Sequence, residues 1–289
     1  MKLTGRRESS NVDDRRGTSK GKVAGVGLGG LLLVAVMTYF TTGGNMGSVV
    51  SAVVQKAATS TITTADGYTP TAEEEELLTF AKQILAGTED VWADQFKKLG
   101  KTYEPHKMVL FHGSVNSGCG SATASTGPFY CSADETVYLD LEFFTTMRQQ
   151  FGTAGDFAYA YVVAHEVGHH VQNQLGILNQ VHTKMNQVSE TESNHLSVRL
   201  ELQADFLAGV WAYKDNEMFN SLEEGDVEEG LAIAAKIGDD YLQKQAYGYT
   251  VPESYNHGTS EQRGRWLKKG LTTGDINGCD TFSPAYSNL

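Results

Sequence analysis

The sequence contains few cations beyond its first 22 residues. The chain has 289 residues and a formal net charge of −12. Residues 1–22 hold seven Lys or Arg against three Asp or Glu, a net charge of +4, which leaves −16 on the remainder. Nucleic-acid binding requires clustered cations that neutralise phosphates, so this acidic body is expected to bind no nucleic acid.

Cysteine is also scarce, with Cys119, Cys131 and Cys279 alone. Their spacing matches no cysteine-based zinc motif. An oxidising compartment would permit one disulfide and leave one thiol. We prefer the pair Cys119–Cys131, because both residues flank one loop rich in Gly and Ser. A bridge from either residue to Cys279, or three reduced thiols, are the open alternatives.

Charge is absent from residues 23–40, whose sequence is VAGVGLGGLLLVAVMTYF. A bilayer core about 30 Å thick needs about 20 helical residues, so this run predicts a single transmembrane helix. Lys and Arg precede the run and few follow it, which predicts a cytoplasmic N-terminus and an extracytoplasmic C-terminal part at the cell membrane. The alternative is a cleaved signal peptide, although the polar tail is long and no clear A-x-A site follows.

The rest of the chain divides by composition. Residues 41–71 are rich in Thr, Ser, Gly and Ala without sustained periodicity, which is typical of a flexible linker. We therefore expect a basic cytoplasmic tail over 1–22, a membrane helix over 23–40, a linker over 41–71 and one folded domain over 72–289. No internal repeat is visible.

Hydrophobic periodicity in the folded part predicts an α+β protein dominated by helices. Strands are expected at 108–111 and 136–140, with a loop over 113–127. Helices are expected from the cap Thr71 to Leu85, and over 89–99, 141–151, 156–175, 189–213, 225–245 and 259–271. The strand over 136–140 is either an edge that pairs with an extended peptide or an ordinary core strand.

The strongest chemical signal is His165-Glu166-Val167-Gly168-His169, an H-E-x-x-H motif. Residues four apart on a helix leave the same face, so His165 and His169 can bind one Zn²⁺ ion. Glu166 can then reach water at the open coordination position and act as the general base. The extended motif of metzincins is excluded, because Gln172 and Leu175 occupy the places of its Gly and third His.

A third ligand is expected from Glu201, on the following long helix. Glu201 would complete a set of two His and one Glu. Asp205, four residues on, could accept a hydrogen bond from the other N–H of a ligand histidine. Apolar residues surround both acids, and a buried carboxylate needs a cation or hydrogen bonds. His170 points away from His169 and is interpreted as a residue that packs or supports the site, and not as a ligand.

Several blocks resemble a bacterial neutral zinc metallopeptidase family, the YpfJ-like group of gluzincin-type zincins. They are GRRESSNVDDRR, SGCGSA with GPFYC and VYLDLEFF, AHEVGHHVQ, LQAD with AGVWA, and VPESYNHGTSEQRGRWLKKGL. The resemblance implies a zincin-like domain with a small β-sheet in a membrane-anchored zinc peptidase. The family's residues fall on His165, Glu166, His169 and Glu201. Phe206 stands where we would expect Cys, which affects no catalytic position.

A weaker similarity connects the chain with integral-membrane gluzincins. They share H-E-x-x-H, then E-x-x-x-D, then a late His and Arg six residues apart, a spacing matched by His257 and Arg263. His257 could donate to the oxyanion of the tetrahedral intermediate, and Arg263 could orient His257 or the substrate. The alternative is a histidine at a helix N-terminus with a surface arginine.

These observations predict a membrane-anchored zinc endopeptidase that acts on peptides or proteins through a metal-activated water. The alternative is a non-catalytic, membrane-tethered zinc-binding scaffold or adaptor that keeps the fold. Structural zinc sites are usually closed by four protein ligands, and only three good candidates are found. A fourth ligand such as His195 or Glu192 would favour the scaffold.

Overall fold

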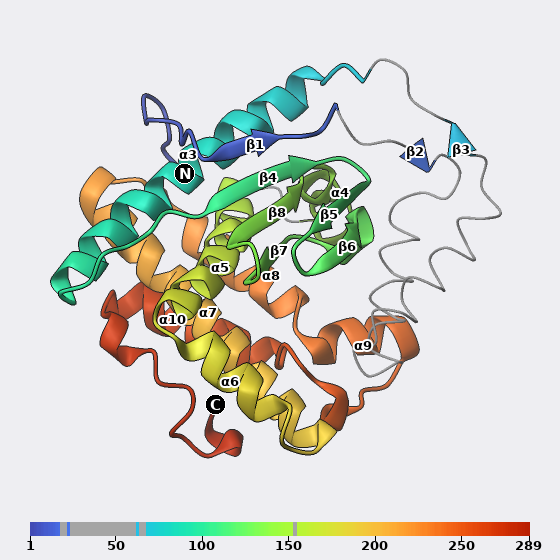
Figure 1. Ribbon diagram of the computed structural model, residues 1–289, viewed down its shortest axis with the longest axis vertical. Helices are drawn as coiled ribbons and strands as arrows, with labels where there is room; N and C mark the ends of the chain where they lie inside the picture. The colour runs from blue at the N-terminus through green and yellow to red at the C-terminus, as the bar shows by residue number, and fades with distance from the viewer. Residues whose placement is uncertain (18–21, 24–61, 64–67, 153–154) are drawn as a thin grey trace. The chain divides into compact units, whose positions relative to one another are not determined.

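The computed structural model describes residues 1–17, 22–23, 62–63, 68–152 and 155–289, and these adopt an α+β fold dominated by helices (Figure 1). The chain divides into two compact units. Unit 1 comprises Met1–Ser10, Phe80–Pro105 and Thr153–Leu289, and unit 2 comprises Asn11–Thr79 and His106–Gly152. The helices and the small sheet confirm the α+β, helix-dominated class predicted from the sequence.

Unit 2 contains a mixed four-stranded sheet in the order β1-β4-β8-β7. Its strands are β1 (Val12–Asp14), β4 (Lys107–Phe111), β7 (Phe129–Cys131) and β8 (Thr136–Asp140). β4 is parallel to both β1 and β8, whereas β7 is antiparallel to β8. Helix α4 (Glu142–Phe151) follows β8 and ends at Gly152, whose φ of 63° suits glycine.

β8 is a central strand of this sheet. All five of its residues are buried, and it pairs with β4 on one side and β7 on the other. β4 pairs with all five residues and β7 with Thr136–Tyr138, so β8 has a neighbouring strand on each side. The prediction that 136–140 is an edge strand for extended peptide is wrong, and the core-strand alternative holds.

The segment expected to be a loop over 113–127 contains a hairpin of β5 (Ser114–Ser117) and β6 (Gly120–Thr123). A disulfide joins Cys119 to Cys131, the pair preferred from the sequence, and Cys279 is free. Cys131 is buried in a cluster with Val109, Phe111 and Tyr138. Two short strands, β2 (Lys22–Val23) and β3 (Ile62–Thr63), form a separate antiparallel pair.

Helix α3 runs without interruption over Ala72–Lys98, where two helices were expected. The apparent break came from Gly87 and Thr88, which interrupt the apolar pattern. Packing explains the glycine at position 87, because a Cβ there would lie 2.6 Å from Arg6 Nη2 and 2.7 Å from Asp215 Oδ1. The helix continues because its buried face on both sides of Gly87 is apolar.

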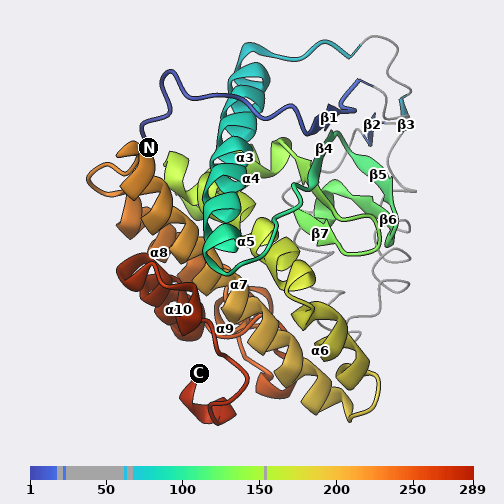
Figure 2. The ribbon, with the colours of Figure 1, turned by 60° about the vertical axis from the view of Figure 1, so that its left-hand side comes forward.

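The remaining helices belong to unit 1 (Figure 2). They are α5 (Asp156–Gln174), α6 (Ile177–Met185), α7 (Glu190–Phe219), α8 (Asp226–Lys236), α9 (Asp239–Tyr247) and α10 (Ser260–Thr273). Two of them, α8 and α9, replace the single helix expected over 225–245. The break falls at Gly238, where a Cβ would lie 2.2 Å from the backbone N of Ser260. Helix α6 was not predicted.

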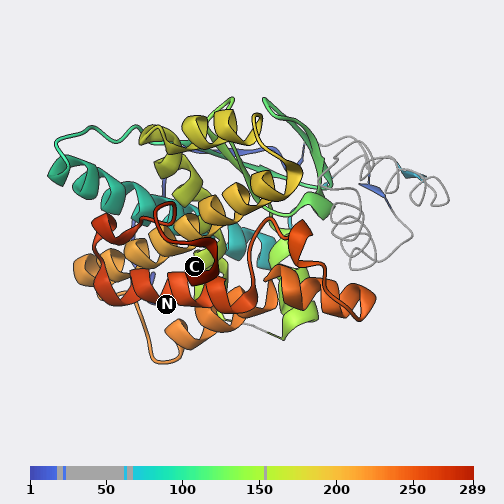
Figure 3. The ribbon, with the colours of Figure 1, turned by 90° about the horizontal axis from the view of Figure 1, so that it is seen from below.

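Helices α7 and α10 cross at two glycines. A Cβ on Gly270 would lie 2.1 Å from Phe206 O, and one on Gly209 would lie 2.4 Å from Leu267 O. The absence of side chains at both positions therefore allows backbone contact. Beyond α10 the chain returns along α7, where Thr281 Oγ1 donates to Arg199 O at 2.7 Å (Figure 3).

Residues 1–17, predicted to be part of a tail, are built into the two units. Leu3, Ser9 and Arg16 are buried, and β1 lies in the sheet. The predicted membrane segment over 23–40 and linker over 41–71 fall mostly on residues outside the described ranges. None of the helices in the described part of the chain is long and apolar enough to cross a membrane.

Candidate metal centre

The two histidines of the motif lie on one face of α5. Most of this helix is buried, and His165 itself is 6% exposed. The ring centroids of His165 and His169 lie 4.9 Å apart, as expected for residues one helical turn apart. Glu166 and His169 are half-buried, so the motif is not sealed on every side.

Glu201 brings a carboxylate from α7 to both imidazoles. Its Oε2 lies 3.1 Å from His165 Nε2, and its Oε1 lies 3.4 Å from His169 Nε2. One ligand atom from each of the three residues lies within 4.8 Å of the other two. Two ligands bound to one tetrahedral zinc at about 2.0–2.1 Å are about 3.3 Å apart, so this donor set fits the ion. Burial alone would raise the pKa of Glu201, but His169 and His165 lower it, which keeps the carboxylate ionised.

The close packing of α5 against α7 depends on Gly168, inside the motif. A Cβ at this position would lie 3.1 Å from Ala204 O and 3.2 Å from Ala204 Cα. Glycine thus lets the backbones of the two ligand-bearing helices approach closely. Ala204 lies between Glu201 and Asp205, so this contact fixes the position along the helix axes at which both acids face the histidines.

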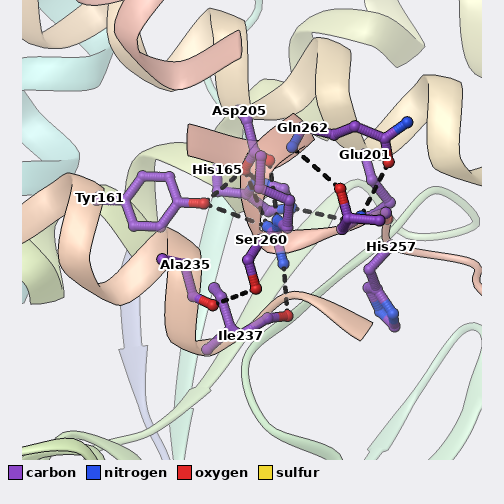
Figure 4. A network of polar contacts seen from close by, with 12 residues as sticks. Tyr161, His165, Glu201, Asp205, Ala235, Ile237, His257, Ser260 and Gln262 are labelled. Atoms are coloured by element: carbon purple, nitrogen blue, oxygen red, sulfur yellow. Dashed lines mark hydrogen bonds and ion pairs between the residues drawn. The ribbon is translucent and has the colours of Figure 1, made fainter. Parts of the chain in front are cut away.

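Asp205 holds the opposite edge of the His165 ring. Asp205 Oδ1 lies 2.8 Å from His165 Nδ1 and accepts from Tyr161 OH at 2.6 Å (Figure 4). Arg263, on α10, donates to both carboxylate oxygens. Burial would raise the pKa of Asp205, but the charges of Arg263 and His165 lower it to about 2. An ionised Asp205 fixes the proton of His165 on Nδ1 and turns Nε2 toward Glu201.

Arg263 forms a buried ion pair with this acid. Its side chain is 5% exposed and donates hydrogen bonds to Asp205, Tyr161 and the carbonyl of Ile237. This burial contradicts the alternative of a surface arginine. Arg263 thus holds Asp205, and its role in orienting His257 or the substrate stays a prediction.

Gln172 supports the second histidine and was missed by the sequence analysis. Its Oε1 lies 2.9 Å from His169 Nδ1, and its Nε2 donates to Leu200 O and Gln203 Oε1. Gln172 is fully buried. Its amide thus links His169 on α5 to Leu200 on α7, the residue that precedes Glu201. The i, i+3 spacing from His169 was a signal that the sequence contained.

His257 pairs with a second acid that was missed, Asp239. Asp239 Oδ1 lies 3.2 Å from His257 Nδ1, while Oδ2 accepts from the backbone N of Asn256, His257 and Gly258. Asp239 is fully buried, whereas the His257 side chain is 36% exposed. Burial would lower the pKa of His257, but Asp239 and then Glu201 raise it. His257 is thus held at its Nδ1 edge and is accessible on part of its surface.

Comparison with known proteins agrees with this geometry. Residues 1–282 match the family described as "Putative neutral zinc metallopeptidase". The chain belongs to this family. It is 45% identical to "Uncharacterized protein YpfJ" of Escherichia coli K12 over 295 aligned positions, which cover 98% of this chain and 99% of the relative. It is also 46% identical to "Uncharacterized protein Rv2575" of Mycobacterium tuberculosis over 191 positions, 63% of each protein. No solved structure matches the chain.

Other histidines of this family member have partners elsewhere. His170 Nε2 lies 2.8 Å from Glu104 O, and its ring packs edge-on against Tyr103, in agreement with the predicted packing role. His195 stacks on Tyr286 at 3.8 Å between centroids and lies 3.7 Å from Glu192. Neither His195 nor Glu192 belongs to the ligand group of His165.

A second group of potential ligands lies in unit 2. It comprises His112, Asp140 and Glu142. Asp140 already accepts from the backbone N of Gly113 and of Glu142, at 2.9 and 3.0 Å. These bonds organise the turn from β8 into α4 and account for the acid without a metal. We therefore assign no ion to this group.

Proposed function

We propose that this chain is a zinc-dependent endopeptidase that hydrolyses peptide bonds in peptides or proteins. The observation that carries the proposal is the convergence of His165, His169 and Glu201 within 4.8 Å, next to Glu166. A zinc ion held there would act as a Lewis acid and lower the pKa of water to about 7. Membership of the neutral zinc metallopeptidase family supports the same substrate class.

Different side chains of this protein carry out the remaining steps of hydrolysis. Glu166, one residue from His165 and half-buried, accepts the proton of the attacking water and returns it to the leaving amine. His257 donates a hydrogen bond to the oxyanion, and Asp239 holds its ring at Nδ1. Asp205 and Gln172 fix the two ligand histidines.

Membrane attachment through residues 23–40 is part of the proposal. It is supported by the uncharged composition of that run. An extracytoplasmic location of the catalytic residues is supported by the disulfide Cys119–Cys131, which is typical of oxidising compartments. Cell fractionation tests the attachment. If residues 23–40 anchor the protein, the full chain should remain in the membrane fraction after a carbonate wash. Recovery in the soluble fraction would refute it.

The catalytic assignment is tested by measuring zinc content and hydrolysis of casein by the purified full chain. Glu166→Gln should keep the wild-type zinc content and lose activity by about 10²–10⁴-fold, because it removes only the base. Glu201→Gln should lose zinc as well. Glu192→Gln, on the same helix but exposed, is the matched control and should change neither.

Two outcomes would contradict the proposal. Normal turnover by Glu166→Gln would refute its role as the base. A zinc-loaded wild-type chain that cleaves neither casein nor a library of peptides would favour the alternative, a zinc-binding scaffold that lacks turnover.

A further inference from the structure

Residues 1–10 are an integral part of unit 1, which contains the candidate metal centre. The backbone N of Lys2 donates to Ser221 O at 2.8 Å, and the backbone N of Ser9 donates to Lys82 O at 3.0 Å. Leu3 and Ser9 are buried. This segment is therefore fixed at both ends by backbone hydrogen bonds to helix α3 and to the turn after α7.

The firmest contact joins Arg6 to Asp215, on α7. Arg6 Nη1 donates to Asp215 Oδ2 at 2.8 Å, and Nη2 donates to Oδ1 at 2.6 Å. The Asp215 side chain is fully buried, and that of Arg6 is 11% exposed. A buried carboxylate of this kind requires a cation. Gly87 leaves the space that the guanidinium occupies.

Arg7 and Ser9 fasten the same segment to α3. Arg7 Nη2 donates to Asp90 Oδ1 at 2.7 Å and to Ala86 O at 3.0 Å. Ser9 Oγ donates to Glu89, in a contact that is buried. One carbonyl and two carboxylate groups of α3, on Ala86, Glu89 and Asp90, thus have partners in residues 7–9.

The next residues are equally integral to unit 2. β1 adds to the sheet as a parallel neighbour of β4, with Asp13 opposite Val109. Arg16 is buried and donates to Asp14 at 2.7 Å and to Glu75 at 2.9 Å. Residues 11–16 therefore complete a sheet and neutralise an acid at the start of α3.

These contacts also change how the N-terminal cations bear on the predicted membrane topology. Three of the arginines in residues 1–16 form ion pairs with acids of helices α7 and α3: Arg6 with Asp215, Arg7 with Asp90 and Arg16 with Glu75. Arg15 pairs with Asp13 inside the segment itself. The positive-inside rule concerns cations that stay on the cytoplasmic side next to a membrane segment. Arginines that are needed to neutralise acids of the catalytic fold must be on the same side as that fold.

We infer that residues 1–16 lie in the same compartment as the metal centre, so that residues 23–40 make no net crossing of a membrane. A single crossing would separate the two by about 30 Å of hydrocarbon. Val23 also pairs with Ile62 across β2 and β3, and paired strands lie about 4.8 Å apart. A shared compartment for residues 1–16 and the metal centre replaces the single-crossing arrangement predicted from the sequence.

The inference is tested by cysteine labelling of the full chain in intact bacteria, with Cys279→Ser as the background. Ser10→Cys and Lys268→Cys each place one thiol at an exposed position of unit 1. A membrane-impermeant maleimide is applied to one sample before lysis and to another after lysis. For each cysteine, the labelling before lysis is divided by the labelling after lysis. Cysteines in known cytoplasmic and exported proteins calibrate the ratio. The readout does not depend on peptidase activity.

We expect the two positions to give ratios that agree within about twofold, whichever compartment they share. A tenfold difference, with one position labelled and the other protected until lysis, would overturn the inference. The intact mass of the purified chain is the second measurement. A mature chain that lacks residues 1–16 would overturn the inference too, because a signal peptide would then have been removed.

Discussion

Arg263 donates from Nε and Nη2 to the two carboxylate oxygens of Asp205, both at 2.9 Å. Both side chains are buried, so neither charge has water as an alternative partner. The pair joins α10 to α7 at the level of the candidate metal centre. Because Asp205 also holds His165, the stability of the fold and the orientation of a ligand depend on the same contact.

Arg263→Ala should therefore destabilise the protein by about 3–5 kcal/mol, because it leaves a buried carboxylate without a cation. Chemical denaturation of the purified chain measures the loss. The control is Arg265→Ala on the same helix, whose ion pair with Glu261 is exposed and should contribute about 1 kcal/mol or less. Equal losses in the two variants would show that the Arg263 pair has no special role.

The pair of His257 and Asp239 predicts a specific kinetic pattern. His257→Ala should lower kcat by about 10²–10³-fold with zinc content unchanged, as expected for loss of an oxyanion donor. Asp239→Asn should lower kcat by less and leave KM within a few fold, because the amide can still bond to the ring. His195→Ala, which lies outside the ligand group, is the control. A change in KM alone for His257→Ala would indicate substrate binding instead.

The candidate ligands were predictable from the sequence because their signals are local. His165 and His169 share one helical turn, and Glu201 and Asp205 share another, so period and composition were sufficient to place them. The starts expected at Ser189 and Thr259 are local signals too, since these residues cap α7 and α10.

The contacts of Asp239 and Arg263 could not be predicted, because they depend on chain segments far away. Asp239 acts through the backbone of residues 256–258, and Arg263 acts through Asp205 on another helix. β1 has three residues and no alternating pattern, so its place beside β4 depends on the sheet that it joins. The break at Gly238 likewise has its physical reason in Ser260, at the start of α10.

The crossing of α7 and α10 offers a matched pair of substitutions on α10. Gly270→Ala should destabilise by about 1–3 kcal/mol, because its Cβ would lie 2.1 Å from Phe206 O and the backbones would have to separate. Gly264→Ala has nothing within 4 Å of its Cβ and should stabilise by about 0.5–1 kcal/mol through helix propensity. Thermal unfolding of both variants measures the difference. Stabilisation by both would show that the helices cross at a greater distance.

The ion pair between Arg6 and Asp215 can be measured by a double-mutant cycle on the purified full chain. Asp215→Ala and Arg6→Ala should each destabilise strongly, whereas the double variant should lose much less than the sum of the two losses. The expected coupling is about 1–3 kcal/mol, because either single change leaves a poorly solvated charge. Lys214 and Glu217, an exposed pair on the same helix, should couple by less than about 0.5 kcal/mol. Additive losses at Arg6 and Asp215 would mean that residues 1–10 do not pack on α7, and the shared compartment inferred for them would lose its physical basis.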